Sequence, residues 1–513
     1  MDRSGPAHPS TFTSFVLYFP RAHRYSPHSR GPGPAWDRDG NSNSHAEWFV
    51  RFMAGSTTTA EAGQLRLRRV LTLWDLVFYG LVLIQPTAPI PLFGVAQKLS
   101  NGHTVTTILI AMFAMMITAF SYGRMAAVYP SAGSAYTYVG KALSPHLGFL
   151  IGWAMLLDYI LQPLINTIWI AVAIHTRYVP AIPFPVAALL VAGFITVLNL
   201  RGIKASARAN KVLLISMCAV IAAFLYLAVH YLFNGGGWHS LFSVQPFYDP
   251  KTFNGHQIWM ATSFAALTYI GFDGITTLSE DVENPKRNVL LATVLVCFLT
   301  GVFSGVEVYL GQRVWPNWHT FANLETAFMD VCRRVGGMPL FQAMGAILVL
   351  AALGSGLTGG LGAARLLFGM GRDGVLPRRF FAHLHRETNT PTYNILLIGL
   401  VAFIGAVSLN YIGNAYEHAA ELLNFGAFLA FMGVNLSTFW HFSIVLRSNN
   451  RRRILGDAIL PLAGFAFCAL IWWNLNIVAK TVGGIWFAIG LTYIAVTTRG
   501  FRLKPKLIDF SES

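Results

Sequence analysis

Three acidic residues lie well inside apolar stretches of this 513-residue chain. Asp158 stands in GWAMLLDYILQP, Asp273 in YIGFDGITT and Glu307 in SGVEVYLGQ. A charge at the centre of a bilayer costs at least about 2.5–3.5 kcal/mol, so an acid at that depth is a candidate for binding a cation or carrying a proton. Each can instead be a structural carboxylic acid, protonated or hydrogen-bonded between helices. We take Asp158 and Asp273 as the stronger functional candidates.

Prolines interrupt the first apolar stretch, Leu71 to Gln97. Pro86, Pro89 and Pro91 stand where the centre of the bilayer should be. Proline has no N–H and clashes with the preceding turn, which frees carbonyls where lipid cannot hydrogen-bond them. One proline is compatible with a merely kinked helix, because proline is common in membrane helices. The cluster predicts a true break that lines a binding cavity.

Glycines flank Asp273 in the segment Trp259 to Asn288. Gly271 and Gly274 each lower helix stability by about 1 kcal/mol, although glycine pairs also serve close helix packing. We predict a second unwinding point here. The two breaks lie in the first and sixth apolar stretches, and this offset of five is expected of two inverted five-helix repeats with a site at mid-membrane.

Composition supports a membrane protein. Hydrophobic residues make up 54% of the chain, charged residues 12%, and the mean hydropathy is +0.51; a soluble domain carries about twice that charge. We expect an all-α integral membrane protein with twelve transmembrane helices, each an apolar stretch of about 20 residues. They lie at roughly 72–97, 104–128, 146–173, 181–200, 211–233, 256–279, 288–312, 339–369, 392–410, 418–446, 457–478 and 481–499.

Basic residues predict the orientation. If the N-terminus is cytoplasmic, most Lys and Arg from Arg66 onward fall in inner segments. We therefore expect a protein of the inner membrane with both termini in the cytoplasm. The outer segments hold only Lys98, Arg177, Lys251, Arg313, Arg333, Arg334 and Lys480. The net charge of +15 then reflects topology, and no nucleic-acid partner is expected.

The four cysteines do not have metal-ligand spacing. Cys218, Cys297 and Cys468 fall inside predicted helices and Cys332 in an outer loop, so neither a disulfide nor a metal site is expected.

Residues 1–65 differ from the rest in being polar and rich in Pro, Ser, Gly and His, which is typical of disorder. The segment Thr11 to Phe19 lacks the features of a signal peptide, and Met53 is an alternative start. We therefore expect a disordered extension (1–65), a transporter domain (66–500) and a cytoplasmic tail (501–513).

Four segments give the chain a resemblance to the amino acid–polyamine–organocation superfamily, and within it to the putrescine-importer-like branch. They are Ser121 to Tyr159, Gly202 to Asn210, Tyr269 to Val289 and Gly362 to Phe380. The resemblance implies a LeuT-type fold, with helices one to five and six to ten as inverted repeats, and a solute carrier rather than an enzyme.

The resemblance also implies which residues bind substrate. In such carriers, N–H groups of the broken first helix hold the substrate carboxylate, and carbonyls of the sixth take its ammonium. Carried over to this chain, the two segments supply Gln85, Thr87, Ala88 and Ile90, and Leu267, Thr268, Tyr269, Ile270 and Gly271. Amino acid carriers usually have a Gly-rich turn in the first segment, whereas this chain has prolines.

The substrate class follows from this departure. A diamine has no carboxylate to hold and needs carbonyls, aromatic faces and carboxylates for its ammonium groups. Asp158, Tyr159, Tyr269 and Asp273 can supply them, although the YIGFD segment also occurs in carriers of ordinary amino acids. We expect an amino acid or a related amine, with a polyamine as a sub-case.

Energy coupling is predicted to use a proton, through Asp158 or Asp273. Ser355 and Thr358 can offer hydroxyls to sodium, but small residues there also serve close helix packing. No cofactor is expected, and the chain has no GxxxxGK[ST] motif for binding ATP. GxSxG and HExxH are also absent, which argues against an intramembrane hydrolase. An exchanger, a nutrient receptor or a channel on the same fold stays open, and no oligomeric state is predicted.

Overall fold

The computed structural model describes residues 71–503 and 505, with gaps at 131–132, 202–206, 280–281, 373, 386–389 and 447–453. The expectations for residues 1–65, for a start at Met53 and for most of the C-terminal tail fall outside the described residues. The described part is helical, and its single β-type pairing is an isolated bridge between Leu71 and Val282. The all-α fold class is therefore confirmed.

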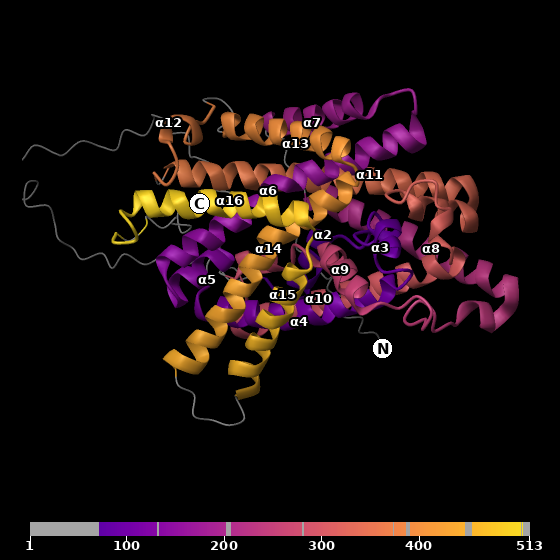
Figure 1. Ribbon diagram of the computed structural model, residues 1–513, viewed down its shortest axis with the longest axis horizontal. Helices are drawn as coiled ribbons and strands as arrows, with labels where there is room; N and C mark the ends of the chain where they lie inside the picture. The colour runs from indigo at the N-terminus through magenta and orange to yellow at the C-terminus, as the bar shows by residue number, and fades with distance from the viewer. Residues whose placement is uncertain are drawn as a thin grey trace, which may run out of the picture. The chain divides into compact units, whose positions relative to one another are not determined.

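The helices follow one another with short connections (Figure 1). Up to residue 241 they are α2 (Leu73–Ile84), α3 (Phe93–Leu99), α4 (Thr104–Val128), α5 (Ser134–Ala142), α6 (Pro145–Ala173), η1 (Ile174–Tyr178), α7 (Phe184–Leu200) and α8 (Ala207–Leu241). Up to residue 372 they are α9 (Gly255–Ala265), η2 (Ala266–Tyr269), η3 (Phe272–Leu278), α10 (Pro285–Val314), η4 (Trp318–Thr320) and α11 (Ala327–Arg372). The last are α12 (Arg378–Phe381), α13 (Thr392–Ile412), α14 (Ala415–Phe439), η5 (Trp440–Val445), η7 (Leu455–Ile459), α15 (Leu460–Trp473) and α16 (Ile477–Thr497).

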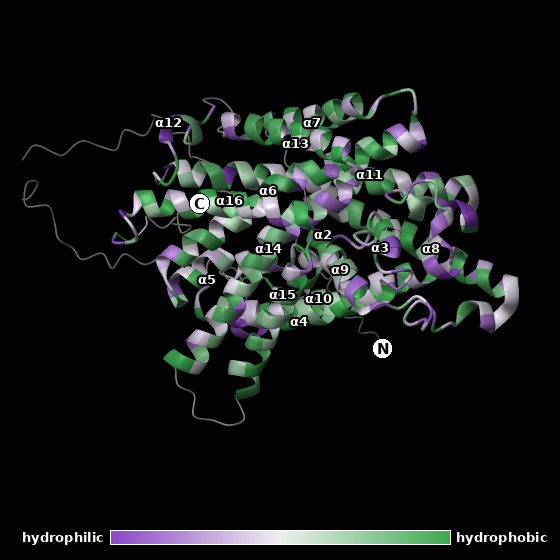
Figure 2. Cartoon of the chain, viewed as in Figure 1, coloured by the Kyte–Doolittle hydropathy of each residue, from purple (hydrophilic) through white to green (hydrophobic). Residues whose placement is uncertain are grey.

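Among the described residues, nine helices are long and apolar enough to cross a membrane, and Leu73–Ile84 and Phe184–Leu200 are shorter apolar helices. Each stretch that hydropathy predicts coincides with a helix, or with an interrupted helix in the first and sixth cases. Figure 2 shows that green, hydrophobic residues predominate along these helices, with white and purple turns among them.

The start of α11 differs from the sequence prediction. The helix begins at Ala327 instead of near 339, and it bends at Gly337, where φ is +65°. Hydropathy misses residues 327–338 because Asp330 and two arginines lower the average. Their apolar residues nevertheless recur at helical spacing and are buried. Cys332, predicted to lie in a loop, is therefore in a buried helical face.

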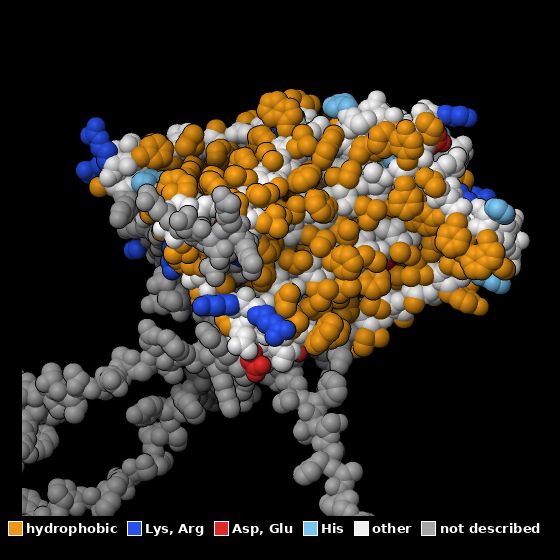
Figure 3. Space-filling view, turned by 90° about the horizontal axis from the view of Figure 1, so that it is seen from below, with side chains coloured by type: hydrophobic (Ala, Val, Ile, Leu, Met, Phe, Trp, Pro, Cys, Tyr) orange, Lys and Arg blue, Asp and Glu red, His pale blue; other side chains and the backbone are white. Residues whose placement is uncertain are grey.

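The packing separates central from peripheral helices. α6 packs against α14 and α11, and α4 packs against α10. In the most apolar stretch of Ala415–Val445, 72% of the residues are buried. The corresponding share in Thr392–Ile412 is 22%. Hydrophobic side chains cover a broad area of one face, with Lys and Arg toward its margins (Figure 3). Such a surface suits contact with lipid, because a soluble protein rarely exposes a large continuous apolar area.

Candidate substrate site

The first membrane helix is interrupted where its prolines lie. α2 ends at Ile84, Gln85 takes a positive φ of 68°, and the chain runs through turns to the start of α3 at Phe93. The N–H groups of Gln85, Ala88 and Ile90 each donate to a main-chain carbonyl earlier in the segment. The break predicted from the prolines is confirmed, and these three N–H groups are used by its own turns or, for Gln85, by the last turn of α2.

The second interruption follows α9. The chain passes through η2, an extended Ile270 and Gly271 at a φ of +114° before η3 begins. This φ is in the left-handed region that favours glycine. The hydroxyl of Thr268 is buried and has no hydrogen-bond partner among the described residues. The unwinding point predicted from the glycines is confirmed.

The two interruptions lie against each other. A Cβ placed on Gly271 would be 3.7 Å from the carbonyl oxygen of Leu83 and 3.8 Å from Cγ1 of Ile84. Away from the breaks, the N–H of Glu283 donates to the carbonyl of Leu71 at 2.9 Å, which ties the chain after η3 to the start of α2. Residues that are far apart in sequence therefore form one irregular region in the middle of the bundle.

The two acids that the sequence singles out lie within electrostatic reach of each other. Asp273, on η3, lies against the main-chain N–H groups of its own turn, at Gly271, Asp273 and Gly274. Asp158, on α6, is within electrostatic reach of Asp273, and the Gln162 side chain lies near its carboxyl. Its Oδ1 atom is buried without a hydrogen-bond partner in the described part of the chain. Asp273 therefore has main-chain N–H groups near its carboxyl, whereas Asp158 has one carboxyl oxygen without a hydrogen-bond donor.

Two tyrosines complete the surroundings of the acids. Tyr159 is within electrostatic reach of both Asp158 and Asp273. Tyr79, on α2, is also within reach of Asp273, and the sequence prediction missed it. A tyrosine six residues before Gln85, less than two turns from the break, is the signal that could have identified it. Tyr269 faces elsewhere, because its hydroxyl donates to the carbonyl of Ile108 on α4 at 2.8 Å.

The predicted site residues differ in accessibility. Partly exposed are Gln85, Ala88, Asp158, Tyr159, Leu267, Gly271 and Asp273. Buried are Thr87, Ile90, Thr268, Tyr269 and Ile270. Polar groups that stay partly exposed deep in the helix bundle can be reached by a small ligand. We therefore restrict the candidate site to the partly exposed set together with Tyr79 and the Thr268 hydroxyl.

The predicted coupling-ion residues on α11 have protein partners. The Ser355 hydroxyl donates to Oε1 of Gln162 at 3.2 Å, and the Asn166 amide donates to Ser355 at 3.2 Å. The Gln85 amide donates to the carbonyl of Ala351, also on α11, at 3.1 Å. Thr358 is exposed, and its hydroxyl donates to a carbonyl of its own helix. Side-chain amides thus connect the first break and α6 to α11.

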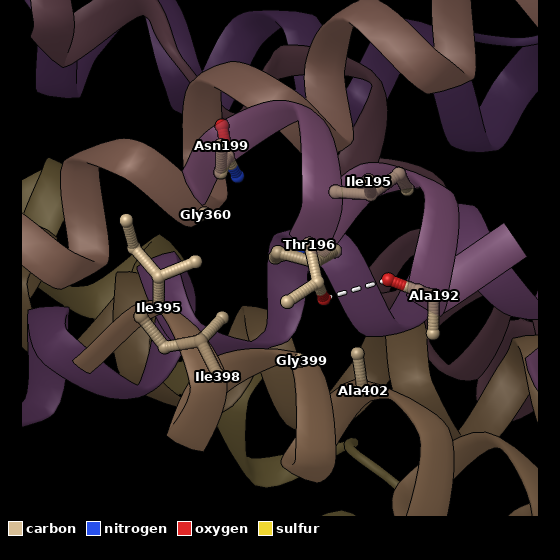
Figure 4. Close-up of a pocket in the computed structure, with 10 residues that line it drawn as sticks. Ala192, Ile195, Thr196, Asn199, Gly360, Ile395, Ile398, Gly399 and Ala402 are labelled. Carbon is tan, nitrogen blue, oxygen red and sulfur yellow. Dashed lines mark hydrogen bonds between the residues drawn. The ribbon is translucent and has the colours of Figure 1, made fainter. Parts of the chain in front are cut away.

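A separate small cavity of about 10 Å³ lies between α6, α7, α11 and α13 (Figure 4). Its wall contains Asn199, whose Oδ1 has no hydrogen-bond partner among the described residues, and Gly360, which faces Asn199. Such a volume holds about one water molecule. None of its lining residues belongs to either helix break, so it is not part of the candidate site.

Comparison with known proteins identifies the family. The amino acid permease family model matches residues 90–498. The low-affinity putrescine importer PlaP of Escherichia coli is 36% identical over 452 residues, which covers 86% of this chain and 97% of that protein. The branched-chain amino acid permease BcaP of Lactococcus lactis is 27% identical, covering 84% and 95%. The methylthioribose transporter of Bacillus subtilis is also 27% identical, covering 88% and 98%.

These relatives are importers, permeases and transporters, and this chain matches nearly the whole length of each. Together with the long apolar helices of the described region, they identify a multi-pass membrane transporter. The resemblance seen in the four sequence segments is confirmed. The chain belongs to the amino acid permease family of the amino acid–polyamine–organocation superfamily.

Proposed function

We propose that this chain carries a diamine of the putrescine type across the cytoplasmic membrane by proton-coupled alternating access. The wider substrate class is amino acids and related amines. The observation that carries the proposal is that Asp158 lies within electrostatic reach of Asp273, which follows the break at Gly271. Two carboxylates near each other at low dielectric repel, and a cation or a proton between them relieves that repulsion.

The choice of an amine over an α-amino acid depends on the first break. Its N–H groups at Gln85, Ala88 and Ile90 already donate to main-chain carbonyls, which leaves few donors for a substrate carboxylate. An ammonium group needs acceptors, and the carboxylates supply them, with the rings of Tyr79 and Tyr159 as additional cation-binding faces. The similarity to a putrescine importer agrees with this choice. The similarity to a branched-chain amino acid permease keeps amino acids in the wider class.

The two acids take different roles in this proposal. Asp273 lies among main-chain N–H donors, which suit an acceptor that stays ionised and pairs with the substrate ammonium. Asp158 has an oxygen without a donor, which suits a group that itself takes up and releases the coupled proton. Since the two lie within electrostatic reach, binding of an ammonium at Asp273 changes the field at Asp158. That interaction couples substrate to proton.

The proposed architecture has twelve membrane crossings arranged as two inverted five-helix repeats and two further helices, with both termini in the cytoplasm. Supporting this, a helix or an interrupted helix occurs at each predicted stretch, and the interruptions fall in the first and sixth. The transporter domain then spans residues 66–500. The end of the bundle where α2 begins is cytoplasmic, and the end where α3 finishes is outer.

A proton is proposed over sodium because Asp158 is a titratable carboxyl with an oxygen that has no hydrogen-bond partner among the described residues. On the sodium side, the carbonyl of Ala351 already accepts from the Gln85 amide, and the Ser355 hydroxyl accepts from the Asn166 amide. These bonds occupy lone pairs that a sodium ion between the first helix and α11 would use, whereas proton binding at Asp158 displaces neither of them.

Uptake into proteoliposomes tests the proposed function. Purified protein should accumulate putrescine against its gradient when the lumen is alkaline, and the rate should saturate with concentration. A nutrient receptor would bind putrescine without accumulating it. A channel would give flux that does not saturate at low concentration and never runs uphill. An exchanger would need amine inside the vesicle and would ignore the pH gradient.

A further inference from the structure

A larger cavity opens at the end of the bundle where α3 finishes. Its volume is about 360 Å³, and it lies between α3, η1, the 322–325 loop and the turn from α13 to α14. The side chains that decide its chemistry are Lys98, His175, Glu325 and Glu417. A cavity of this size is within the range of small-molecule sites. It contains none of the residues of the candidate site at the helix breaks.

Glu325 is held in place at the wall of this cavity. The indole N–H of Trp169, on α6, donates to the main-chain carbonyl of Glu325 at 3.2 Å. The carboxyl itself accepts from the N–H of Tyr416, at the start of α14, at 3.4 Å. Its position is therefore defined by two central helices of the bundle.

The nearby arginine does not neutralise Glu325. Arg177, on η1, donates to the Thr326 hydroxyl at 2.8 Å and forms an ion pair with Asp330. Its charge is matched by the carboxylate of Asp330, which lies outside the cavity wall. The pair fixes η1 to the segment that carries Glu325.

The cavity wall thus has two carboxyls, and the lysine in it interacts with one of them, Glu417. Glu417 lies within electrostatic reach of Glu325, and Lys98, an exposed side chain, interacts with Glu417. An exposed ammonium is screened by water, whereas partly buried carboxyls are screened less. Burial and the neighbouring Glu417 raise the pKa of Glu325, which lies outside the membrane-spanning helices, to about 7. A cation in the cavity would relieve the repulsion between the two acids.

We propose that this cavity is a second, outer binding site for an organic amine, in which Glu325 and Glu417 hold an ammonium group of the substrate before it reaches the helix breaks. The ligand class rests on the proposed function; the location rests on the cavity and its carboxyls. The site raises the local concentration of the cation at the mouth of the transporter, as clefts of one charge sign do for oppositely charged ligands.

Kinetics of the full-length protein in proteoliposomes test this proposal. Glu325→Gln and Glu417→Gln should each raise the KM for putrescine about fivefold, the size expected for losing one partly solvated ion pair. The kcat should stay unchanged, because neither residue touches the helix breaks. Asp249→Asn is the matched control. It removes one negative charge at the same end of the bundle, from a residue outside the cavity wall, and should leave both constants unchanged.

A binding measurement separates the outer site from the inner one. In Asp273→Asn, calorimetry with putrescine should show residual weak binding, which disappears when Glu325→Gln and Glu417→Gln are added. An unchanged KM in both glutamine variants, or a fall in kcat alone, would overturn the outer site while leaving the proposed function intact. Absence of putrescine binding and uptake in the wild-type protein would instead overturn the proposed substrate.

Discussion

Gly271 faces the carbonyl of Leu83, and a Cβ on Gly271 would lie 3.7 Å from that oxygen. One residue belongs to the break after α9 and the other to the last turn of α2, so this approach joins the two irregular segments into one site. Bulk at this position should therefore block substrate.

Gly271→Leu should abolish putrescine binding, because the branched side chain occupies the space between the breaks. Its φ of +114° also strains any side chain, so membrane expression and thermal stability must be measured alongside binding. Gly193→Leu is the control. A Cβ added at Gly193 would meet no other described atom within 4 Å, and the variant should bind normally. Binding retained in well-folded Gly271→Leu would place the substrate elsewhere.

Asp273→Asn should raise the KM for putrescine at least about tenfold, which corresponds to losing about 1.4 kcal/mol of binding. The amide keeps the shape of the carboxyl but cannot pair with an ammonium as an anion. Saturation kinetics in proteoliposomes provide the measurement. A KM within experimental error of the wild-type value would remove Asp273 from the site.

The breaks could be predicted from sequence because their causes are local. Proline lacks an N–H wherever it stands. Glycine, the residue at position 271, is one of the few residue types that take a left-handed φ readily. The side chains that meet at the breaks are different. Tyr79 was missed, and Tyr269 was assigned to the site although its hydroxyl bonds to Ile108. Which way a side chain faces depends on helix rotation, which a one-dimensional pattern does not contain.

The start of α11 shows the same limit in the fold. Averaged hydropathy finds helices that are apolar on all sides, and the segment before Gly337 is apolar on one side only. The outer cavity could not be predicted either. Glu325 and Glu417 are distant in sequence, and only the packing of the 322–325 loop beside the start of α14 brings them into electrostatic reach.

Sodium should not drive uptake. With the Ser355 hydroxyl and the Ala351 carbonyl accepting from Asn166 and Gln85, replacement of external sodium by choline should leave the initial rate of putrescine uptake unchanged at constant pH. Radiolabelled uptake in the two media is the comparison. A rate that rises with sodium concentration and saturates would show that an ion displaces these bonds.

The KM should depend on pH through Glu325. Its pKa is raised to about 7, so the carboxylate form that attracts a cation is present above that pH and lost below it. With equal pH on both sides, the KM for putrescine should rise as pH falls from about 8 to about 6. Glu325→Gln should remove this part of the dependence. The titratable and charged groups around it are Lys98, His175, Arg177, Asp330 and Glu417. An identical pH profile in wild type and variant would exclude Glu325 as the titrating group.

The proposed orientation can be tested by labelling. Asn234, near the end of α8, is exposed on the proposed outer side, and Arg379, on α12, is exposed on the proposed cytoplasmic side. Cys218 is the exposed native cysteine and should first be replaced by alanine. An impermeant thiol reagent added to whole cells should then modify Asn234→Cys and spare Arg379→Cys. The reverse pattern would invert the topology.

Transport by Asp158→Asn tests the central claim most directly. The amide keeps shape and hydrogen-bonding capacity but removes the titratable group. In proteoliposomes with an alkaline lumen, uphill accumulation of putrescine should vanish, whereas exchange of labelled for unlabelled putrescine at equal pH should continue. Accumulation equal to that of the wild-type protein would contradict the account, because it would show that the carboxyl beside Asp273 carries no coupled proton.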